Sequence, residues 1–458
     1  MSNRKMSNRR ILASVALAAL TLTAGCAPGV EGVPGAPIMA EAPPPPPYVP
    51  PPPPPPPLAM APSEGSGDVD DIVVTGSRIP GSSADRAPVP ASPVRPRPQS
   101  QAGVLTAGDY DDLLNPQAYA RYVASKAQEF EALPYVDTRA AITVTITDAD
   151  GRPKPFVPVR ISRPQGGALE LKTLADGSVV LFPALDGLGR TAEISVPGPR
   201  GQMTRRTLSV GSDRRLEITV PGAPAQVRAM DLMLVIDATG SMGDEINYLK
   251  VELDSIVTAL KERHPGLDLR LGLIVYRDVG DDYVVRQYAF TGNTEAVQTL
   301  LSKQSADGGG DYPEAVDQAM AAAVAAPWRD DAAKALVLVA DAPPHDQNIG
   351  ATWATTLQAR DKRIQIVPVA ASGVAEKAEF VMRAMAAVTQ SRYLFLTDDS
   401  GVGNPHAAPE VKCYVVTRLD ALLRRVLDGI VSGRRIEPRG TEIIRRVGAY
   451  DDGVCEPR

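Results

Sequence analysis

The stretch Asp231–Met242, DLMLVIDATGSM, indicates the fold of the second half of the chain. Its apolar run ends abruptly at Asp237, and two hydroxyl residues, Thr239 and Ser241, follow at alternate positions before an acid-led helix. A short, nearly continuous apolar run is typical of a strand in a parallel sheet that is covered on both faces. In an extended or gently turning loop, alternate side chains point the same way. The three oxygen-bearing side chains can therefore converge on one ion.

Strand-like runs alternate with helical patterns from residue 230 onward. The runs are Leu232–Ile236, Leu269–Tyr276, Tyr283–Phe290, Ala335–Ala340, Ile364–Ala370 and Tyr393–Leu396. This alternation predicts a doubly wound, mostly parallel α/β sheet. Sheets of this kind bind ligands beyond the carboxyl ends of their strands, which is where the residues after Ile236 are expected to lie.

Two further acids fall at equivalent positions. Asp341 follows the run Ala335–Ala340, and Asp311 lies in the loop ADGGGDYPE just before another helix. Carboxylate and hydroxyl oxygens, with water completing the shell, suit Mg²⁺ or Mn²⁺, with Ca²⁺ as a further alternative. The sequence thus predicts a divalent-cation site, Mg²⁺ first, whose ligands are Asp237, Thr239, Ser241, Asp311 and Asp341.

The chain from about Val227 to Ile430 resembles a von Willebrand factor type A domain, and its segment DATGS matches the metal-ion-dependent adhesion site of that family. The later segments GDYPEAV and DAPPH are similar to those of bacterial exported members. The resemblance implies a Rossmann-like fold over residues 227–432 and a metal ion with one open coordination position for an acidic group on a partner, which is a protein or another acidic ligand. It also implies that Asp237, Thr239, Ser241 and Asp341 are ligands.

Asp311 stands where this family usually has a threonine. Its direct ligation is therefore an open question: it could act through water, or Asp307 could substitute for it. An extra carboxylate would strengthen ion binding and make the site less welcoming to an acidic partner.

Three alternatives to metal-dependent recognition stay open. The domain could keep the fold without binding metal, or the metal could only stiffen the loops of a structural envelope scaffold. The third is a serine hydrolase, because Ser241, Asp341 and His406 follow the chain order of α/β-hydrolases. Thr239, however, occupies the place of the first glycine in the hydrolase turn, where a β-branched residue is strained. We therefore expect a protein that is not an enzyme.

Two smaller regions are expected before the α/β domain. A helical linker over residues 105–135 should begin with an acidic turn and continue as a helix from Pro116, capped by Asn115. Residues 136–222 should form a small antiparallel β-sandwich, because short runs alternate with turn signals. Its predicted strands are Ile142–Thr147, Phe156–Ile161, Ala168–Lys172, Ser178–Phe182, Thr191–Val196, Thr204–Val210 and Arg215–Val220.

The N-terminal hundred residues carry the signals of an exported protein. Basic residues precede the apolar run Ile11–Gly25, which is too short to span a bilayer comfortably. The run leads to TAGC, which resembles a bacterial lipobox, although Thr23 stands where leucine is usual. We expect a signal peptide over residues 1–25 and a lipid on Cys26, with a plain secretory signal as the alternative. The resulting location is the cell envelope, at the outer membrane.

Residues 26–104 are expected to be a disordered tether, because most of the chain's 44 prolines crowd there. A polyproline run at residues 43–57 favours an extended stalk. Within the tether, Asp71–Ile79 belongs to DDIVVTGSRI, which resembles the segment of outer-membrane receptors that TonB captures by strand addition. The sequence thus indicates a possible TonB contact.

The net charge argues against one class of partner, and the cysteine content predicts a disulfide. The net charge of −6 becomes −6 − 4 = −10 once the four basic residues of the signal peptide are removed. An acidic balance argues against nucleic-acid binding, which needs concentrated Lys and Arg. If Cys26 is lipidated, Cys413 and Cys455 remain, and in an oxidising compartment they are expected to form a disulfide that ties down the tail at residues 433–458.

Overall fold

The computed structural model describes residues 104–130, 132–401 and 406–455. The predictions for the signal peptide, Cys26, the proline-rich tether and Asp71–Ile79 lie outside these residues. Among the helices that are described, none is long and apolar enough to cross a bilayer.

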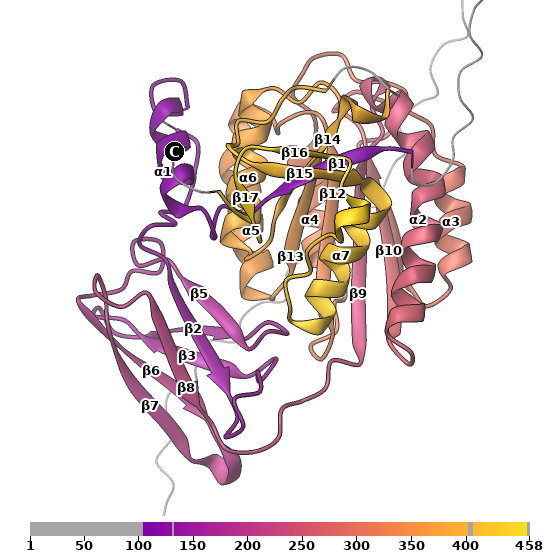
Figure 1. Cartoon of the computed structure of the whole chain (residues 1–458). Coiled ribbons are helices and arrows are strands. Elements are labelled where there is room, and N and C mark those ends of the chain that lie inside the picture. The colour runs from indigo at the N-terminus through magenta and orange to yellow at the C-terminus, as the bar shows by residue number, and fades with distance from the viewer. Residues whose placement is uncertain (1–103, 131, 402–405, 456–458) are drawn as a thin grey trace, which may run out of the picture. The chain divides into compact units, whose positions relative to one another are not determined.

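A large sheet occupies the centre of the second half of the chain (Figure 1). Within the described residues it has nine strands. Five neighbouring strands of the sheet run parallel to one another, and the strand at one edge pairs antiparallel with the first of them. In spatial order the strands are β11 (Val285–Thr291), β10 (Asp268–Tyr276), β9 (Ala229–Asp237), β12 (Ala333–Ala340), β13 (Gln365–Ala370), β14 (Tyr393–Thr397), β1 (Thr106–Tyr110), β15 (Tyr414–Arg418) and β16 (Arg445–Val447). The predicted doubly wound, mostly parallel sheet is confirmed.

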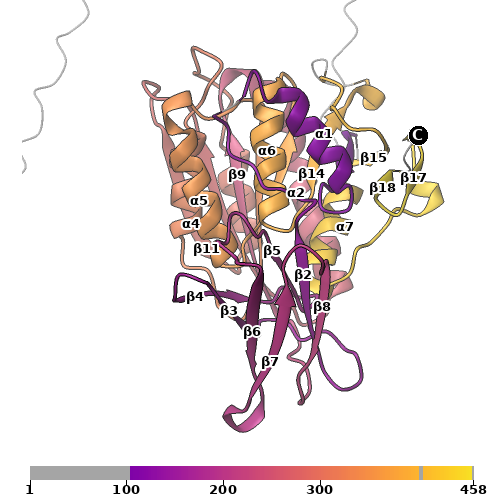
Figure 2. The same cartoon turned by 90° about the vertical axis from the view of Figure 1, so that its left-hand side faces the viewer.

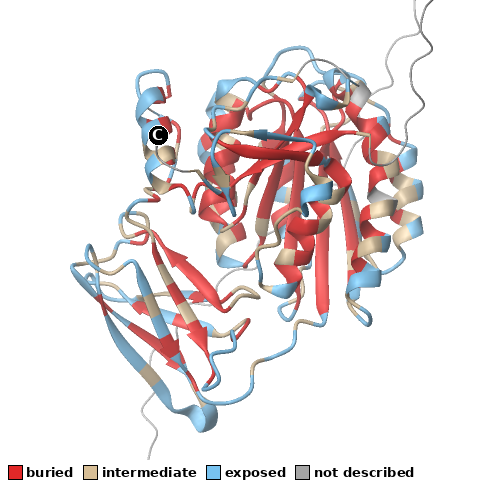
Figure 3. Cartoon of the chain, in the orientation of Figure 1, coloured by how far each residue is buried: buried red, intermediate tan, exposed pale blue. Residues whose placement is uncertain are grey.

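Helices cover both faces of this sheet. One apolar core lies under α2 (Gly243–Arg263), α3 (Thr294–Ser302) and α7 (Leu419–Ser432). A second lies under α4 (Val316–Ala325), α5 (Ile349–Asp361) and α6 (Glu376–Val388). Every residue of β9 and β12 is buried, as Figure 3 shows by the red strands between the helices. Burial on both faces explains why these strands are nearly continuous apolar runs.

Strand β1 was not expected from the sequence. Its residues, TAGDY, are small and acidic and indicated a turn, but they form a buried strand between β14 and β15, antiparallel to both. The position needs a glycine, because a Cβ on Gly108 would lie 2.7 Å from the ring of Phe395. Asp109 is tolerated there because Arg392 donates to its carboxylate at 3.1 Å.

Helix α1 (Pro116–Lys126) begins at the expected proline. Asn115 stands at its N-cap position, but its side chain does not cap the helix. The Asn115 amide instead donates to the Gly453 carbonyl at 2.7 Å and accepts from the Cys455 backbone at 2.8 Å. Cys455, in the short hairpin of β17 (Tyr450–Asp451) and β18 (Val454–Cys455), is joined to Cys413 by a disulfide. These contacts fix the end of the chain against the sheet.

The region between α1 and β9 is a sandwich of two small sheets (Figure 2). One contains β5 (Ser178–Leu181), β2 (Ile142–Thr147) and β8 (Arg215–Thr219). The other contains β4 (Ala168–Lys172), β3 (Pro158–Ser162), β6 (Thr191–Pro197) and β7 (Met203–Ser209). All seven predicted strands are present, and one pairing departs from the expected antiparallel pattern, since β2 and β8 run parallel.

The sandwich is joined to the α/β domain by buried polar contacts. Arg360 of α5 pairs with Asp186 at 2.7 Å, and both side chains are buried. The Val180 backbone of β5 donates to the side chain of Gln390 at 2.8 Å. An ion pair that is shielded from water holds its geometry well, because breaking it leaves an unpaired buried charge.

Candidate metal centre

Parallel pairing brings the ends of two strands to one point at the edge of the sheet. Val339 of β12 lies opposite Ile236 of β9, so the residues that follow both strands leave the sheet at the same edge. Asp237 ends β9, and Asp341 comes directly after β12. The register therefore explains why two carboxylates that are distant in sequence influence each other electrostatically.

The turn after β9 gathers the first predicted ligands. One oxygen of the Asp237 carboxylate accepts hydrogen bonds from the Thr239 backbone N–H at 2.9 Å and from the Thr239 hydroxyl at 2.7 Å. The Thr239 and Ser241 hydroxyl oxygens are 3.2 Å apart, and Ser241 lies within hydrogen-bonding reach of Asp341. Asp237 and Thr239 are buried whereas Ser241 is exposed, so the group opens to solvent on the Ser241 side.

The glycine-rich loop at residues 306–315 packs onto this turn. The Asp307 backbone donates to the Ala238 carbonyl at 3.0 Å, and the Gly240 backbone donates to the Gly308 carbonyl at 3.1 Å. Gly309 has a φ of +75°, and a Cβ there would lie 3.0 Å from Oε1 of Glu314 and 3.3 Å from Cβ of Thr239. The close approach of these two side chains to Gly309 places the Glu314 carboxylate beside the turn.

Asp311 and Asp307 lie in this same loop, and both are exposed to solvent. Asp311 is exposed, and within the described residues its side chain makes no hydrogen bond or ion pair. Asp307 is 76% exposed and faces Arg277 at 3.9 Å. His345, which could have lined the site, bonds instead to Asp278 at 2.7 Å. Glu314, which comes three residues after Asp311 and which the sequence did not single out as a ligand, is 4% exposed.

Three carboxylates at this edge carry a buried oxygen that has no hydrogen-bond partner among the described residues. The atoms are Oδ2 of Asp237, Oδ1 of Asp341 and Oε2 of Glu314. Burial, and next the negative charge of Asp341, raise the pKa of Asp237 to about 7. Burial, and next the charge of Asp237, raise the pKa of Glu314 to about 9. Buried carboxylates without partners are costly unless a positive charge compensates them.

The donor set fits a hard divalent cation. Carboxylate and hydroxyl oxygens are its preferred ligands, and the unpaired oxygens supply the negative charge that it needs. In the part of the chain that the structure describes, no three His, Cys, Asp or Glu side chains are already grouped at metal-binding distances. The direct protein ligands of an ion would thus be Asp237, Thr239, Ser241 and Asp341, with water completing the shell.

Comparison with known proteins agrees with this fold. Residues 231–404 match the family model of the von Willebrand factor A domain. The chain contains a von Willebrand factor A domain. This domain supports a role in protein interaction or adhesion.

Two curated relatives match about a quarter of this chain. Alpha-protein kinase vwkA of Dictyostelium discoideum is 32% identical over 119 residues, which are 25% of this chain and 19% of that protein. The putative ariadne-like RING finger protein R811 of Acanthamoeba polyphaga mimivirus is 31% identical over 122 residues, 26% of this chain and 12% of that protein. This chain therefore spans less than a fifth of the length of either relative.

Solved structures similar to this chain include two bacterial proteins. BatB from Bacteroides thetaiotaomicron has a TM-score of 0.32 and 14% identity, covering 44% of this chain and 98% of BatB. The pilus adhesin SpaC from Lactobacillus rhamnosus GG has a TM-score of 0.33 and 12% identity, covering 53% of this chain and 32% of SpaC.

The residues of the hydrolase alternative make different contacts in the A domain. Ser241 lies within hydrogen-bonding reach of Asp341, whereas a hydrolase triad places a histidine between the serine and the aspartate. His406, however, bonds through Nε2 to Ser372 at 3.0 Å and through Nδ1 to Asp398 at 2.8 Å. The Ser372 hydroxyl also donates to Glu245. Both nitrogens of the His406 ring are thus engaged by residues other than Ser241.

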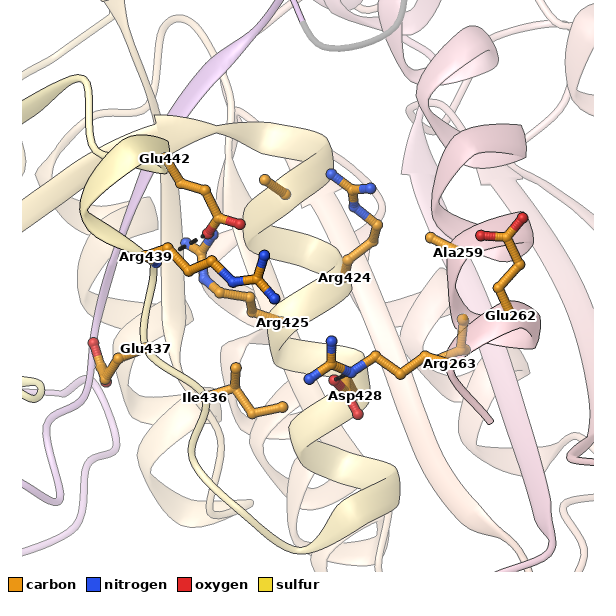
Figure 4. Close-up of a pocket in the computed structure, with 12 residues that line it drawn as sticks. Ala259, Glu262, Arg263, Arg424, Arg425, Asp428, Ile436, Glu437, Arg439 and Glu442 are labelled. Carbon is orange, nitrogen blue, oxygen red and sulfur yellow. Dashed lines mark hydrogen bonds and ion pairs between the residues drawn. The ribbon is translucent and has the colours of Figure 1, made fainter. Parts of the chain in front are cut away.

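A cavity of about 660 Å³ lies at the other end of α2 from the candidate metal centre. Figure 4 shows it between α2 and α7, bordered by the segment at residues 436–442. Arg263 pairs with Asp428 at 2.5 Å and Arg425 with Glu442 at 3.2 Å, so these lining charges are balanced within the A domain. Helix α2 has 21 residues and is therefore about 30 Å long. The cavity is separate from the candidate metal centre.

Without divalent cations, the A domain is expected to lose stability between about pH 4 and pH 7. The pKa of Asp237 is about 7 in the folded protein and about 3.9 for an unfolded aspartate. The folded state then binds more protons than the unfolded state in this window, so the free energy of unfolding falls as the pH rises. Melting temperatures in chelator at pH 5 and pH 7.5 measure this effect.

Asp237→Asn is the matched control for this pH dependence, because it lacks the titrating group and keeps its volume. The difference in melting temperature between the original protein and the variant should change with pH. A difference that stays constant from pH 5 to pH 7.5 contradicts the prediction.

Proposed function

We propose that the A domain binds a divalent cation, with Mg²⁺ preferred over Mn²⁺ or Ca²⁺, and holds a protein partner through that ion. The observation that carries this proposal is the set of buried carboxylate oxygens without partners on Asp237, Asp341 and Glu314. Most buried polar atoms in proteins have a hydrogen-bond partner, and an unpaired buried charge is costly, so three such oxygens at one edge of the sheet support a compensating cation.

Each of the four proposed direct ligands has a defined role. Asp237 supplies formal charge and fixes the Thr239 hydroxyl by a hydrogen bond of 2.7 Å. Thr239 and Ser241 supply neutral oxygens, and Asp341 supplies the second charge. Ser241 is exposed, so a partner can reach an ion bound next to it. A cation held by these residues would supply an open coordination position for an oxygen of the partner.

Exposed apolar side chains border the proposed contact. Tyr312 is 41% exposed, and its hydroxyl donates to the Asp341 carbonyl at 3.1 Å and accepts from the Ala375 backbone. Val279 is 60% exposed and follows Asp278, whose backbone is held by Asp281. Asp281 in turn accepts from the Gly309 backbone at 2.9 Å. Tyrosine is one of the residue types enriched among those that contribute most to protein binding.

The test is partner capture in the presence and absence of the ion. The purified chain and its Asp237→Ala variant are immobilised and exposed to envelope extracts in Mg²⁺ and in chelator. Proteins that are held only by the original chain and only in Mg²⁺ support the proposal. A captured set that is the same in all four conditions contradicts it and favours the structural scaffold, whose contacts do not use the ion.

Attachment to the cell envelope through Cys26 stays a prediction from the sequence. Mass spectrometry of the protein from membranes would detect a lipid on that residue. Capture by the A domain does not depend on this outcome.

A further inference from the structure

Glu314 is a carboxylate that the fold buries without giving it a partner. Its residue is 4% exposed, and it lies just before α4. Its backbone N–H donates to the Pro343 carbonyl at 3.0 Å, which holds it next to the segment that follows Asp341. Its side chain makes no hydrogen bond or ion pair with any residue that the structure describes.

The charged groups with most influence on Glu314 are all acids. They are Asp237, Asp278, Asp341 and Asp281. Asp278 is paired with His345, and Asp281 accepts backbone hydrogen bonds from Asp278 and Gly309. Asp237 and Asp341 each keep an unpaired oxygen. None of the largest electrostatic influences on Glu314 is a cation, and its Oε1 and the Cβ of Thr239 both lie close to the position that a Cβ on Gly309 would take.

We propose that Glu314, and not Asp311, is the third carboxylate of the centre, and that it accepts a hydrogen bond from a water bound to the cation. This inference rests on the proposed function. A bridging water is consistent with the finding that Asp237, Asp341 and Glu314 do not form a group of three direct metal ligands among the described residues. Partners of metal-bound groups orient them and commonly change metal affinity by about 10- to 100-fold.

The charge of the centre then determines which partner group it accepts. Cation binding favours the ionised forms of nearby carboxylates, so in the loaded site Asp237, Asp341 and Glu314 would together carry −3, and a divalent cation would leave a net charge of −1. A carboxylate from a partner meets repulsion there, because like charges at short range are disfavoured in a site of reduced dielectric. The open position selects an uncharged oxygen, such as a hydroxyl or an amide carbonyl of the partner.

The first test compares Glu314→Gln with Asp311→Asn, which removes one charge three residues earlier in the same loop. Calorimetric titration with Mg²⁺ and Mn²⁺ should show affinity lowered by about 10-fold or more in Glu314→Gln and by less than about 3-fold in Asp311→Asn, whose exposed charge is screened by solvent. Equal losses in the two variants, or a larger loss in Asp311→Asn, overturn the inference.

Thermal melting in chelator gives a second readout that does not depend on cation binding. Glu314→Gln should melt at a temperature no lower than that of the original protein, because the neutral amide keeps the volume of the side chain and cannot be repelled by Asp237 and Asp341. A lower melting temperature in chelator would show that Glu314 is needed for packing and would overturn its assignment to the centre. If the original protein binds no cation, the proposed function fails with it; if it binds and Glu314→Gln binds equally well, only this inference fails.

The partner chemistry is tested with two small probes, acetate and acetamide. With Mn²⁺ bound, the paramagnetic ion accelerates proton relaxation of any methyl group held next to it, even in weak complexes. The original protein should relax the acetamide methyl more than the acetate methyl, and Glu314→Gln should reverse that order. Acetate relaxation that is as strong in the original protein as in Glu314→Gln overturns the predicted selection for uncharged oxygens.

Discussion

Replacing Asp237 by alanine is expected to abolish saturable cation binding, with a loss of affinity greater than about 100-fold. Outer partners of metal-bound groups already contribute up to about 100-fold, and Asp237 is assigned as a direct ligand. Its loss also frees Thr239, because the Asp237 carboxylate accepts both the backbone N–H and the hydroxyl of that residue. One substitution thus removes a charge and the orientation of a second ligand.

Calorimetric titration with Mg²⁺, Mn²⁺ and Ca²⁺ measures this loss. Asp150→Ala is the matched control, because Asp150 is an exposed acid on a turn of the sandwich. It should bind the cation as the original protein does. Circular dichroism establishes that both variants are folded, and one-site binding that persists in Asp237→Ala would falsify the assignment of this residue as a ligand.

Replacing Arg383 by methionine is expected to lower the free energy of unfolding by about 3–5 kcal/mol. Arg383 lies on α6 and is 1% exposed. Its Nε and Nη2 donate to Asp112 at 3.1 and 2.7 Å, and its Nη1 donates to Glu379 at 3.0 Å. Methionine leaves two buried carboxylates without their cation, which is the costly way to break a buried ion pair.

Urea denaturation followed by circular dichroism measures this change. Arg206→Met serves as the control, because Arg206 is exposed on β7 and should change the free energy of unfolding by less than about 0.5 kcal/mol. Adding Asp112→Leu to Arg383→Met should recover part of the loss, since it removes one of the unpaired acids. Equal stabilities for Arg383→Met and Arg206→Met contradict the prediction.

The sequence predicted elements whose signal is local. The apolar runs around β9, β12 and β13 were readable because both of their faces are buried, and the sandwich strands because their residues alternate. Strand β1 could not be read in this way. Its Asp109 is stabilised in the sheet by Arg392, which is 283 residues away in sequence. The segment TAGDY by itself does not indicate that this arginine will be its partner.

The same distinction between local and long-range signals applies to the residues of the candidate metal centre. Asp237, Thr239 and Ser241 are determined by the sequence itself, since one turn after one strand sets their spacing, and Asp341 follows from the expectation that parallel strands end at one edge. Only the tertiary structure shows that Asp311 is exposed and Glu314 is buried, which is the basis of the proposal for Glu314. The backbone of the 306–315 loop is held by Ala238, Gly240 and Pro343, and these contacts expose Asp311 and bury Glu314. The burial of these two side chains depends on long-range hydrogen bonds of the loop. The sequence of the loop alone does not show which distant residues provide those bonds.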